Sequence, residues 1–298
     1  MGYNNYTMKT TGSKLKKLEK ILKEMQGLVV AFSGGADSTF LLKKAHDVLG
    51  RKVLAVTALS PTFPLAEQKS AKKLARSIGV RYRIIRSYEL SIPEFVDNPP
   101  NRCYYCKRDL FTRLLEIARA ENLPWVADGS NSDDTHDFRP GAIAAKELGI
   151  RKPLKEARLG KEEIRMLSRE LGLPTGDKPS AACLSSRLPY GDKITSRKLK
   201  QIGRAEEFLH KLGFTQVRVR HHDGIARIEV LPAEMGRFLE RGIQAKVTRQ
   251  LRNLGYRYVT LDLLGYRTGS MNEVLKKAAS PQRSLRARRT PMTGKTEI

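Results

Sequence analysis

The sequence predicts an α/β protein in which a doubly wound parallel sheet is followed by a small α+β domain. The first observation is that short apolar runs alternate with segments of helical periodicity, a pattern typical of parallel strands covered by helices on both faces. These apolar runs lie at residues 28–32, 53–58, 81–85 and 125–127. The second observation is a glycine turn, Ser33–Ser38, directly after the first run. The third is a change of order beyond residue 190, where two neighbouring strands precede helical sequence and a last strand.

The spacing of apolar residues predicts the elements in detail. The helix that opens the fold carries apolar side chains at Leu15, Leu18, Ile21, Leu22 and Met25. Further helices of the first domain are expected at residues 38–49, 65–78, 109–120, 141–148 and 161–171. In the second domain we expect a helix at 196–212 and strands at 216–221, 225–230 and 257–261.

Composition divides the chain into three parts. Its 298 residues are enough for one large domain and a smaller one. The segment Pro174–Tyr190 is rich in Pro, Ser and Gly and has no periodicity. We therefore predict a first domain at 1–190 and a second at 191–275. Residues 276–298 are basic and poor in apolar side chains, which predicts a disordered tail.

The formal net charge of +25 favours polyanionic partners, among them RNA, or small phosphorylated substrates. For any single basic run, a solvated helix surface is the ordinary explanation. No apolar run reaches the length of a membrane span, and residues 1–11 lack the apolar core of a signal peptide. We therefore expect a cytoplasmic protein without a membrane partner.

The turn Ser33–Ser38, with the sequence Ser-Gly-Gly-Ala-Asp-Ser, has the features of a nucleotide-binding loop. Gly34 and Gly35 allow the backbone to approach a phosphate, and the N-terminus of the following helix attracts anions. Ser33 and Ser38 add hydroxyl donors, while Asp37 suits the magnesium ion that accompanies ATP. The spacing differs from the Walker loop and the dinucleotide fingerprint, and it resembles the PP-loop of ATP pyrophosphatases. A tight strand-to-helix turn with a capping aspartate is the alternative.

The chain contains three cysteines, Cys103, Cys106 and Cys183. An odd number in a chain expected in the cytoplasm argues against a disulfide framework. Three thiols suit a [4Fe-4S] cluster with one iron left open to an exogenous ligand. The alternatives are a zinc site with His136 as fourth ligand, redox chemistry by the first two cysteines, and three unrelated core cysteines.

Several further motifs, together with the loop, resemble the LarE family of sulfur transferases. They are Asn98–Lys107, Asp128–Asp134, Phe138–Gly141 and Pro179–Arg187. The resemblance runs in order from about Leu18 to Leu261. It implies a PP-loop domain of the adenine nucleotide alpha hydrolase type, in which Asp128, Gly129 and Asp134 join the loop in binding ATP.

The resemblance also implies a reaction. LarE-like enzymes act in the biosynthesis of the nickel-pincer nucleotide cofactor, first found in lactate racemase. They adenylate a carboxylate of pyridinium-3,5-biscarboxylic acid mononucleotide, release pyrophosphate and install sulfur, and then treat the second carboxylate likewise. One branch of the family sacrifices the sulfur of a single cysteine, matching Cys183, and is left with dehydroalanine.

Another branch has three cysteines and holds a [4Fe-4S] cluster whose open iron carries an extra sulfide. Because this sequence has all three cysteines, the resemblance implies that it belongs to the cluster branch and receives sulfide from a donor. The family resemblance also implies a homo-oligomer. Cys183 and Asp37 are then expected to be catalytic. Lys107 is a candidate for neutralising pyrophosphate, with a solvent-facing helix position as its alternative.

Substrate binding is expected in the second domain. The segment Val217–Arg220 alternates with period two, so Arg218 and Arg220 face one side of a strand. The resemblance places contacts to the substrate phosphate at this strand, and arginine pairs suit phosphate through forked hydrogen bonds. Arg187 and Glu206 complete the expected substrate site. A solvated sheet face is the alternative for the two strand arginines.

Two other functions compete with this one. A tRNA thiolase shares the PP-loop, and some members use a CxxC pair with a distant cysteine; the net charge of +25 favours this rival. The motifs around the cysteines, and the lack of a recognisable RNA-binding module, oppose it. The second competing function is a non-catalytic iron–sulfur or zinc scaffold. ATP-dependent release of pyrophosphate would distinguish the sulfur transferase and the tRNA thiolase from such a scaffold.

Overall fold

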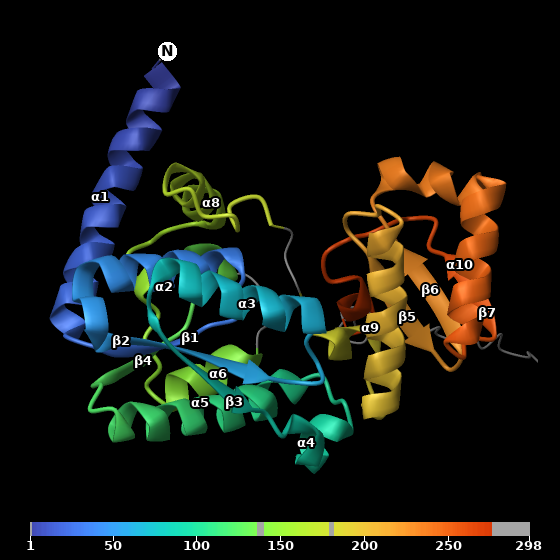
Figure 1. Ribbon diagram of the computed structural model, residues 1–298, viewed down its shortest axis with the longest axis horizontal. Coiled ribbons are helices and arrows are strands. Elements are labelled where there is room, and N and C mark those ends of the chain that lie inside the picture. The colour runs from blue at the N-terminus through green and yellow to red at the C-terminus, as the bar shows by residue number, and fades with distance from the viewer. Residues whose placement is uncertain (1, 136–139, 179–181, 276–298) are drawn as a thin grey trace, which may run out of the picture. The chain divides into compact units, whose positions relative to one another are not determined.

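The structure is a computed structural model that describes residues 2–135, 140–178 and 182–275 (Figure 1). Four features of the sequence fall wholly or partly outside these ranges. They are His136, the first residues of the Phe138–Gly141 and Pro179–Arg187 motifs, and the basic segment 276–298.

Contacts along the chain define two units. The first, Met1–Tyr266, contains both sheets. The second, Arg267–Ile298, has a 3₁₀ turn at Ser270–Asn272 in its described part, and Arg267 pairs with Glu273 at 2.8 Å. The domain limits expected at residues 190 and 275 stay predictions.

The first sheet has four parallel strands in the order β3-β2-β1-β4. They are β1 (Leu28–Ala31), β2 (Val53–Leu59), β3 (Arg81–Arg86) and β4 (Trp125–Ala127). Leu28 of β1 lies opposite Val53 on one side and Trp125 on the other. The strand order reverses between β1 and β4, and in open α/β sheets ligands bind at the carboxyl ends of the strands at such a point.

Helices cover both faces of this sheet, which confirms the predicted fold class (Figure 1). Leu28 and Val30 lie in one core with α1, α2, α3, α7 and α8, whereas Val29 lies in a second core with α5 and α6. This alternation is the period of two that a strand imposes. The helices are α1 (Gly2–Met25), α2 (Ala36–Leu49), α3 (Leu65–Ile78), α5 (Arg102–Ala120), α6 (Pro140–Glu147), α7 (Pro153–Glu156) and α8 (Lys161–Glu170).

Helix α5 begins seven residues earlier than the sequence predicted. We expected the helix from Asp109, preceded by a loop with the cysteines, but Cys103 and Cys106 lie in the first two turns of α5. The short helices α4 (Pro93–Val96) and α7 were not predicted, because four residues are too few to show a helical period.

The second sheet is smaller and mixed. Its strand β5 (Arg218–His222) is antiparallel to β6 (Ile225–Glu229), which is parallel to β7 (Tyr258–Leu261). Two helices, α9 (Ser196–Lys211) and α10 (Arg241–Asn253), contribute to its core. This is the α+β arrangement that the sequence predicted. Among the described residues, no helix is both long and apolar enough to cross a membrane.

Candidate active site

The loop Ser33–Ser38 connects β1 to α2 and is held by its own hydroxyls. Ser33 Oγ lies 3.0 Å from Ser38 Oγ, and the Gly35 amide donates to Ser33 Oγ at 3.3 Å. Gly34 has φ of +73°, and a Cβ there would lie 2.9 Å from the Ala71 Cβ. Both the conformation and the space therefore require glycine at Gly34. The N-terminus of α2 follows directly, as an anion site requires.

The loop after β4 approaches the same place. A Cβ on Gly129 would lie 2.9 Å from the Ser38 amide nitrogen, so only glycine permits this contact. Asp128 Oδ1 accepts a hydrogen bond from the Ser130 amide at 2.9 Å and shapes the turn. The resemblance had singled out Asp128 and Gly129, and the structure places them beside the first loop.

Asp37 is arranged to meet a cation. Asn131 Nδ2 donates to its Oδ2 at 3.3 Å, while Oδ1 is buried and has no hydrogen-bond partner among the described residues. Burial raises the pKa of Asp37, and the negative charge of Asp134 raises it further. A divalent cation would relieve both effects.

Asp37 and Asp134 thus fit a magnesium ion bound together with ATP, since magnesium takes most of its ligands from phosphates and water. Within the described ranges, no group of three or more His, Cys, Asp or Glu side chains could hold a metal ion by itself.

A cavity of about 300 Å³ joins these groups. The predicted residues that line it are Ser33, Gly35, Asp37, Ser38, Lys107, Asp128, Gly129 and Asp134. Lys107 comes from α5, one residue after Cys106, and a Cβ on Gly141 would lie 2.9 Å from its Cγ. Lys107 is half-buried and lines the cavity, and its role at pyrophosphate stays a prediction.

The cavity is also lined by three cationic side chains that the sequence analysis did not identify. Lys161 and Arg165 come from α8 and Lys178 from the loop after it. Arg165 donates to the carbonyl oxygens of Gly176 and Lys178, both at 2.8 Å, and Lys178 Nζ reaches Glu67 at 2.6 Å. These residues lie more than a hundred positions from the loop, and only the tertiary fold brings them to it.

Cys183 lies close enough to Cys103 and Cys106 to raise the pKa of both thiols. Cys183 begins the 3₁₀ turn Leu184–Arg187, and its Sγ lies 2.8 Å from Ser185 Oγ. Burial raises the pKa of Cys106, and the proximity of Cys183 raises it further. Cys103 is partly exposed, but desolvation of its thiol by the surrounding protein raises the thiol pKa. The positive charge of Arg102 opposes this increase, and Cys183 adds to it.

This arrangement is compatible with a cluster held by the three thiols. Each thiol of such a cluster binds a separate iron atom, so the three need not crowd around one point as the ligands of a single ion do. The zinc alternative depends on His136, which lies outside the described residues.

Arg187 heads the fully buried side chains of the described residues in size, and it contacts the turn that begins at Cys183. Its Nε and Nη2 both donate to the Glu206 carboxylate at 2.9 Å, and its Nη1 donates to the Cys183 carbonyl oxygen at 2.9 Å. Burial opposes ionisation of Glu206, but the charge and hydrogen bonds of Arg187 outweigh it, and the pKa of Glu206 lies below its usual range. The two predicted substrate residues thus form an ion pair that holds the Cys183 turn.

Arg218 and Arg220 are buried, and the solvated-face alternative is wrong for both. Arg220 pairs with Glu229 at 2.6 Å and donates to the Ser186 carbonyl oxygen at 3.1 Å. The Arg218 guanidinium lies 5.2 Å from the ring centroid of Tyr266. Burial lowers the pKa of Arg218, and the charge of Arg187 lowers it further. Three arginines therefore gather beside the third cysteine.

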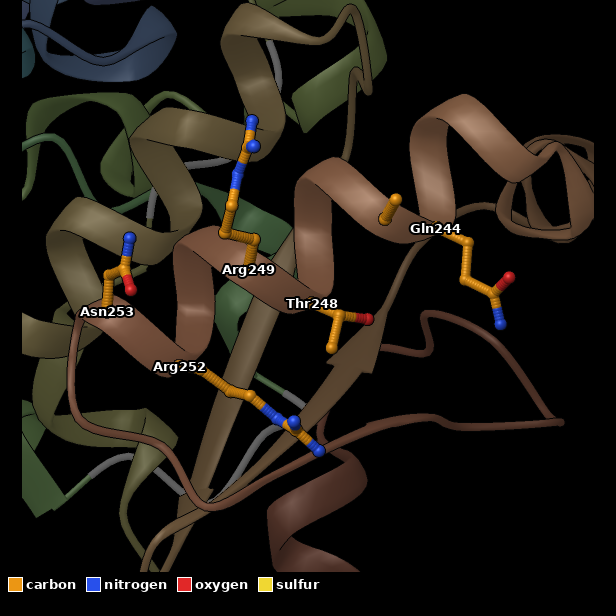
Figure 2. Close-up of a pocket in the computed structure, with 6 residues that line it drawn as sticks. Gln244, Thr248, Arg249, Arg252 and Asn253 are labelled. Atoms are coloured by element: carbon orange, nitrogen blue, oxygen red, sulfur yellow. The ribbon is translucent and has the colours of Figure 1, made fainter.

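A second hollow, of about 540 Å³, lies along one face of α10 (Figure 2). Its lining residues are Gln244, Ala245, Thr248, Arg249, Arg252 and Asn253. They come from a single helix and include no thiol or carboxylate. The chemistry of the smaller cavity, rather than its volume, identifies it as the active-site candidate.

The loop, the sheet and the cavity together define a PP-loop nucleotide-binding enzyme. No protein-family model matches the chain. It is 43% identical to the pyridinium-3,5-bisthiocarboxylic acid mononucleotide synthase of Lactiplantibacillus plantarum, over 91% of this chain and 98% of that protein. The chain belongs to the LarE family of sulfur transferases.

More distant relatives share the PP-loop part. A tRNA-specific 2-thiouridylase of Thermoanaerobacter sp. is 26% identical over 61% of each chain. A component of the glutamine-hydrolyzing GMP synthase of Thermoplasma acidophilum is 28% identical over 51% of this chain and 53% of its own length. In contrast to these partial matches, an uncharacterized protein of Synechocystis sp. is similar over nearly the whole chain, with 44% identity over 89% of this chain and 99% of its own length.

Proposed function

We propose that this protein is an ATP-dependent sulfur transferase that converts pyridinium-3,5-biscarboxylic acid mononucleotide to the bisthiocarboxylic mononucleotide. One observation carries the proposal: a single cavity is lined by the PP-loop and by Lys107 of the thiol-bearing helix α5. Cys106 directly precedes Lys107 in α5, so the helix that carries two of the thiols also contributes to the wall of the cavity proposed to bind ATP. The relationship to the Lactiplantibacillus synthase supports the substrate. The product would serve the nickel-pincer cofactor of enzymes of the lactate racemase type.

The first step overcomes the poor reactivity of a carboxylate, whose oxygen is a bad leaving group. A carboxylate oxygen of the substrate attacks the α-phosphorus of ATP, the bond from this phosphorus to the oxygen bridging to the β-phosphorus breaks, and pyrophosphate leaves. Lys107, Lys161 and Arg165 line the cavity and stabilise the charge that develops on pyrophosphate. Asp37 and Asp134 would hold magnesium, which supplies further neutralisation of the phosphates.

The second step replaces the activated oxygen. A sulfur nucleophile attacks the acyl carbon, and AMP leaves with the former carboxylate oxygen. Cys103, Cys106 and Cys183 would hold a [4Fe-4S] cluster, which supplies an open iron for exogenous sulfide. The Arg187–Glu206 pair fixes the turn of Cys183.

Arg218 and Arg220 would bind the substrate phosphate from β5. Arg220 contacts the carbonyl oxygen of Ser186, three residues beyond Cys183. A phosphate held at these arginines would therefore lie close to the third thiol. The source of sulfide and a homo-oligomeric assembly are further parts of the proposal.

The test is an anaerobic assay of the protein after reconstitution with iron and sulfide. The dicarboxylate mononucleotide and unmodified tRNA are offered separately with ATP and magnesium. We expect pyrophosphate release and a product with sulfur in place of oxygen, seen by mass spectrometry, with the mononucleotide alone. Thiolation of tRNA without reaction of the mononucleotide would overturn the proposal in favour of the tRNA thiolase.

A further inference from the structure

Arg102, at the first position of α5, is a buried cation that the proposed reaction does not yet use. Its side chain is 6% exposed, and its Nε and Nη1 are buried with no hydrogen-bond partner among the described residues. Folded proteins leave few buried donors unsatisfied, and an uncompensated buried charge costs several kcal/mol. Such a group indicates an anion that the site is built to receive.

The surroundings hold Arg102 in place. Its guanidinium carbon lies 4.8 Å from the ring centroid of Tyr190. Asn98, fully buried with φ of +57°, donates to the carbonyl oxygens of Pro189 and Asp192 at 2.6 and 3.0 Å. These bonds fasten the turn that carries Tyr190 to the chain just before α5. The guanidinium is therefore preorganised, and its N–H edges remain available for a ligand.

The position of Arg102 selects the kind of anion. It does not line the nucleotide cavity, so the phosphates of ATP are not its partner. It directly precedes Cys103 at the first position of α5, so its charge adds to the positive end of the α5 dipole beside the thiol site. The negative groups expected at this point are sulfur anions, as thiolates or as sulfide.

We propose that Arg102 is the anion-binding residue of the thiol site and that its ligand is anionic sulfur. The guanidinium would donate N–H···S hydrogen bonds and supply the counter-charge for sulfide held beside Cys103. The proposal rests on the proposed function for the presence of sulfide, but it concerns binding and can be measured without substrate or ATP. Arg102 is a positioning residue in this scheme, because it would contact the anionic sulfur and not the acyl carbon that reacts.

The test compares Arg102→Met, Arg102→Lys and Arg108→Met in the full-length chain under anaerobic, reducing conditions. Arg108 is exposed on the same helix and serves as the matched control. Without added ligand, Arg102→Met should unfold at the same temperature as the unchanged protein or higher, because it removes an uncompensated buried charge. A residue with a purely structural role would lower the unfolding temperature on removal.

Sodium hydrosulfide, and separately iron with sulfide, should then raise the unfolding temperature of the unchanged protein, because a ligand that binds the native state stabilises it. The gain with sodium hydrosulfide should be lost in Arg102→Met, reduced in Arg102→Lys and unchanged in Arg108→Met. The gain with iron and sulfide should be smaller in Arg102→Met than in the unchanged protein, because the three thiols remain but the counter-charge is gone. An equal gain in Arg102→Met, or a lower unfolding temperature of its unloaded form, would overturn the proposal.

Sodium phosphate is the competing probe. An Arg102-dependent gain with phosphate and none with hydrosulfide would make this an oxyanion site and would also overturn the proposal. Failure of the mononucleotide assay leaves these melting experiments fully interpretable, so the two proposals fail separately.

Discussion

The nucleotide cavity and the arginine cluster beside Cys183 accommodate buried charge in opposite ways. In the cavity, Asp37 Oδ1 has no hydrogen-bond partner among the described residues, and Asp134 opposes its ionisation. Beside Cys183, Arg187 forms a forked pair with Glu206 at 2.9 Å, and Arg220 pairs with Glu229 at 2.6 Å. The charge of Asp37 is only partly compensated, by Lys161, Asn131 and Arg165, whereas each of these two arginines is paired directly with a carboxylate.

This difference separates groups that receive ligands from groups that hold the site. A buried polar atom without a partner costs free energy that a ligand would recover. A buried ion pair is already satisfied, and breaking it leaves an uncompensated charge. By this criterion Asp37 and Arg102 are ligand-binding groups, while Arg187 and Glu206 act chiefly by fixing the turn that carries Cys183. Arg220 is also paired, with Glu229, so its proposed contact with the substrate phosphate would be made in addition to that pair.

The largest expected effect is on sulfur transfer by the three thiols. Each of Cys103→Ala, Cys106→Ala and Cys183→Ala should abolish sulfur transfer and leave adenylation largely intact, because all three would hold one cluster. Pyrophosphate release reports the first step, and mass spectrometry of the nucleotide reports the second. Activity that survives loss of Cys103 and Cys106, with Cys183 converted to dehydroalanine, would instead make this a single-use sacrificial enzyme.

The next effect concerns Asp37. Asp37→Asn should lower pyrophosphate release by more than about 100-fold, because it removes a magnesium ligand worth several kcal/mol at the transition state. The ATP-free variant should fold at least as stably as the unchanged protein, since the raised pKa of Asp37 shows that its charged form is disfavoured in the fold. Near-normal ATP turnover in this variant would show that the loop is not the ATP site.

The third effect is on stability rather than chemistry. Arg187→Met and Glu206→Gln should each lower the free energy of unfolding by about 3–5 kcal/mol, because each leaves one partner of a buried pair uncompensated. The double variant should lose less than the sum of the two. Denaturant unfolding of the four proteins measures this coupling, and additive losses would contradict the pairing.

The pH dependence of stability provides a second measurement of the same pair. The pKa of Glu206 is lowered in the folded state. Its contribution to stability is therefore present above the pKa that it has in the unfolded chain, and is lost as pH falls through the folded pKa. Glu206→Gln should flatten this acid limb. Glu207→Gln should change it much less, because the pair that lowers the pKa of Glu207, with Lys211, is exposed and screened by solvent.

The sequence was sufficient for the fold and for the local part of the site. The alternation of apolar runs predicted all four strands of the first sheet, and the runs that became β1 and β2 are buried on both faces. The loop Ser33–Ser38 was recognisable because its glycines, hydroxyls and aspartate are contiguous. Both features depend on short-range spacing, which a single sequence records directly.

The rest depended on tertiary contacts that leave no local signal. Lys161, Arg165 and Lys178 reach the cavity because α8 packs against α2, and nothing in their immediate sequence marks them. The early start of α5 was missed because its first turns carry polar and cysteine residues rather than an apolar stripe. Burial of Arg218 and Arg220 could not be read from an alternation that a solvated strand shares.

The smallest expected effect is on substrate affinity at β5. The double variant Arg218→Ala/Arg220→Ala should weaken binding of the mononucleotide and spare ATP hydrolysis, since neither residue lines the nucleotide cavity. Loss of a charge-assisted contact costs about 1.5–3 kcal/mol when the pair is desolvated. The fold should survive, because Arg227 also contacts Glu229, at 3.3 Å, and continues to compensate its charge.

Calorimetric titration of the mononucleotide measures this effect, and the matched control is Arg218→Lys/Arg220→Lys, which keeps both charges but loses the planar forks. If the arginines grip a phosphate in the forked geometry, the lysine variant should recover only part of the affinity. Full recovery would mean that charge alone attracts the substrate. Affinity unchanged in the alanine variant would assign Arg218 and Arg220 to the scaffold, together with Arg187, and would move the phosphate site away from β5.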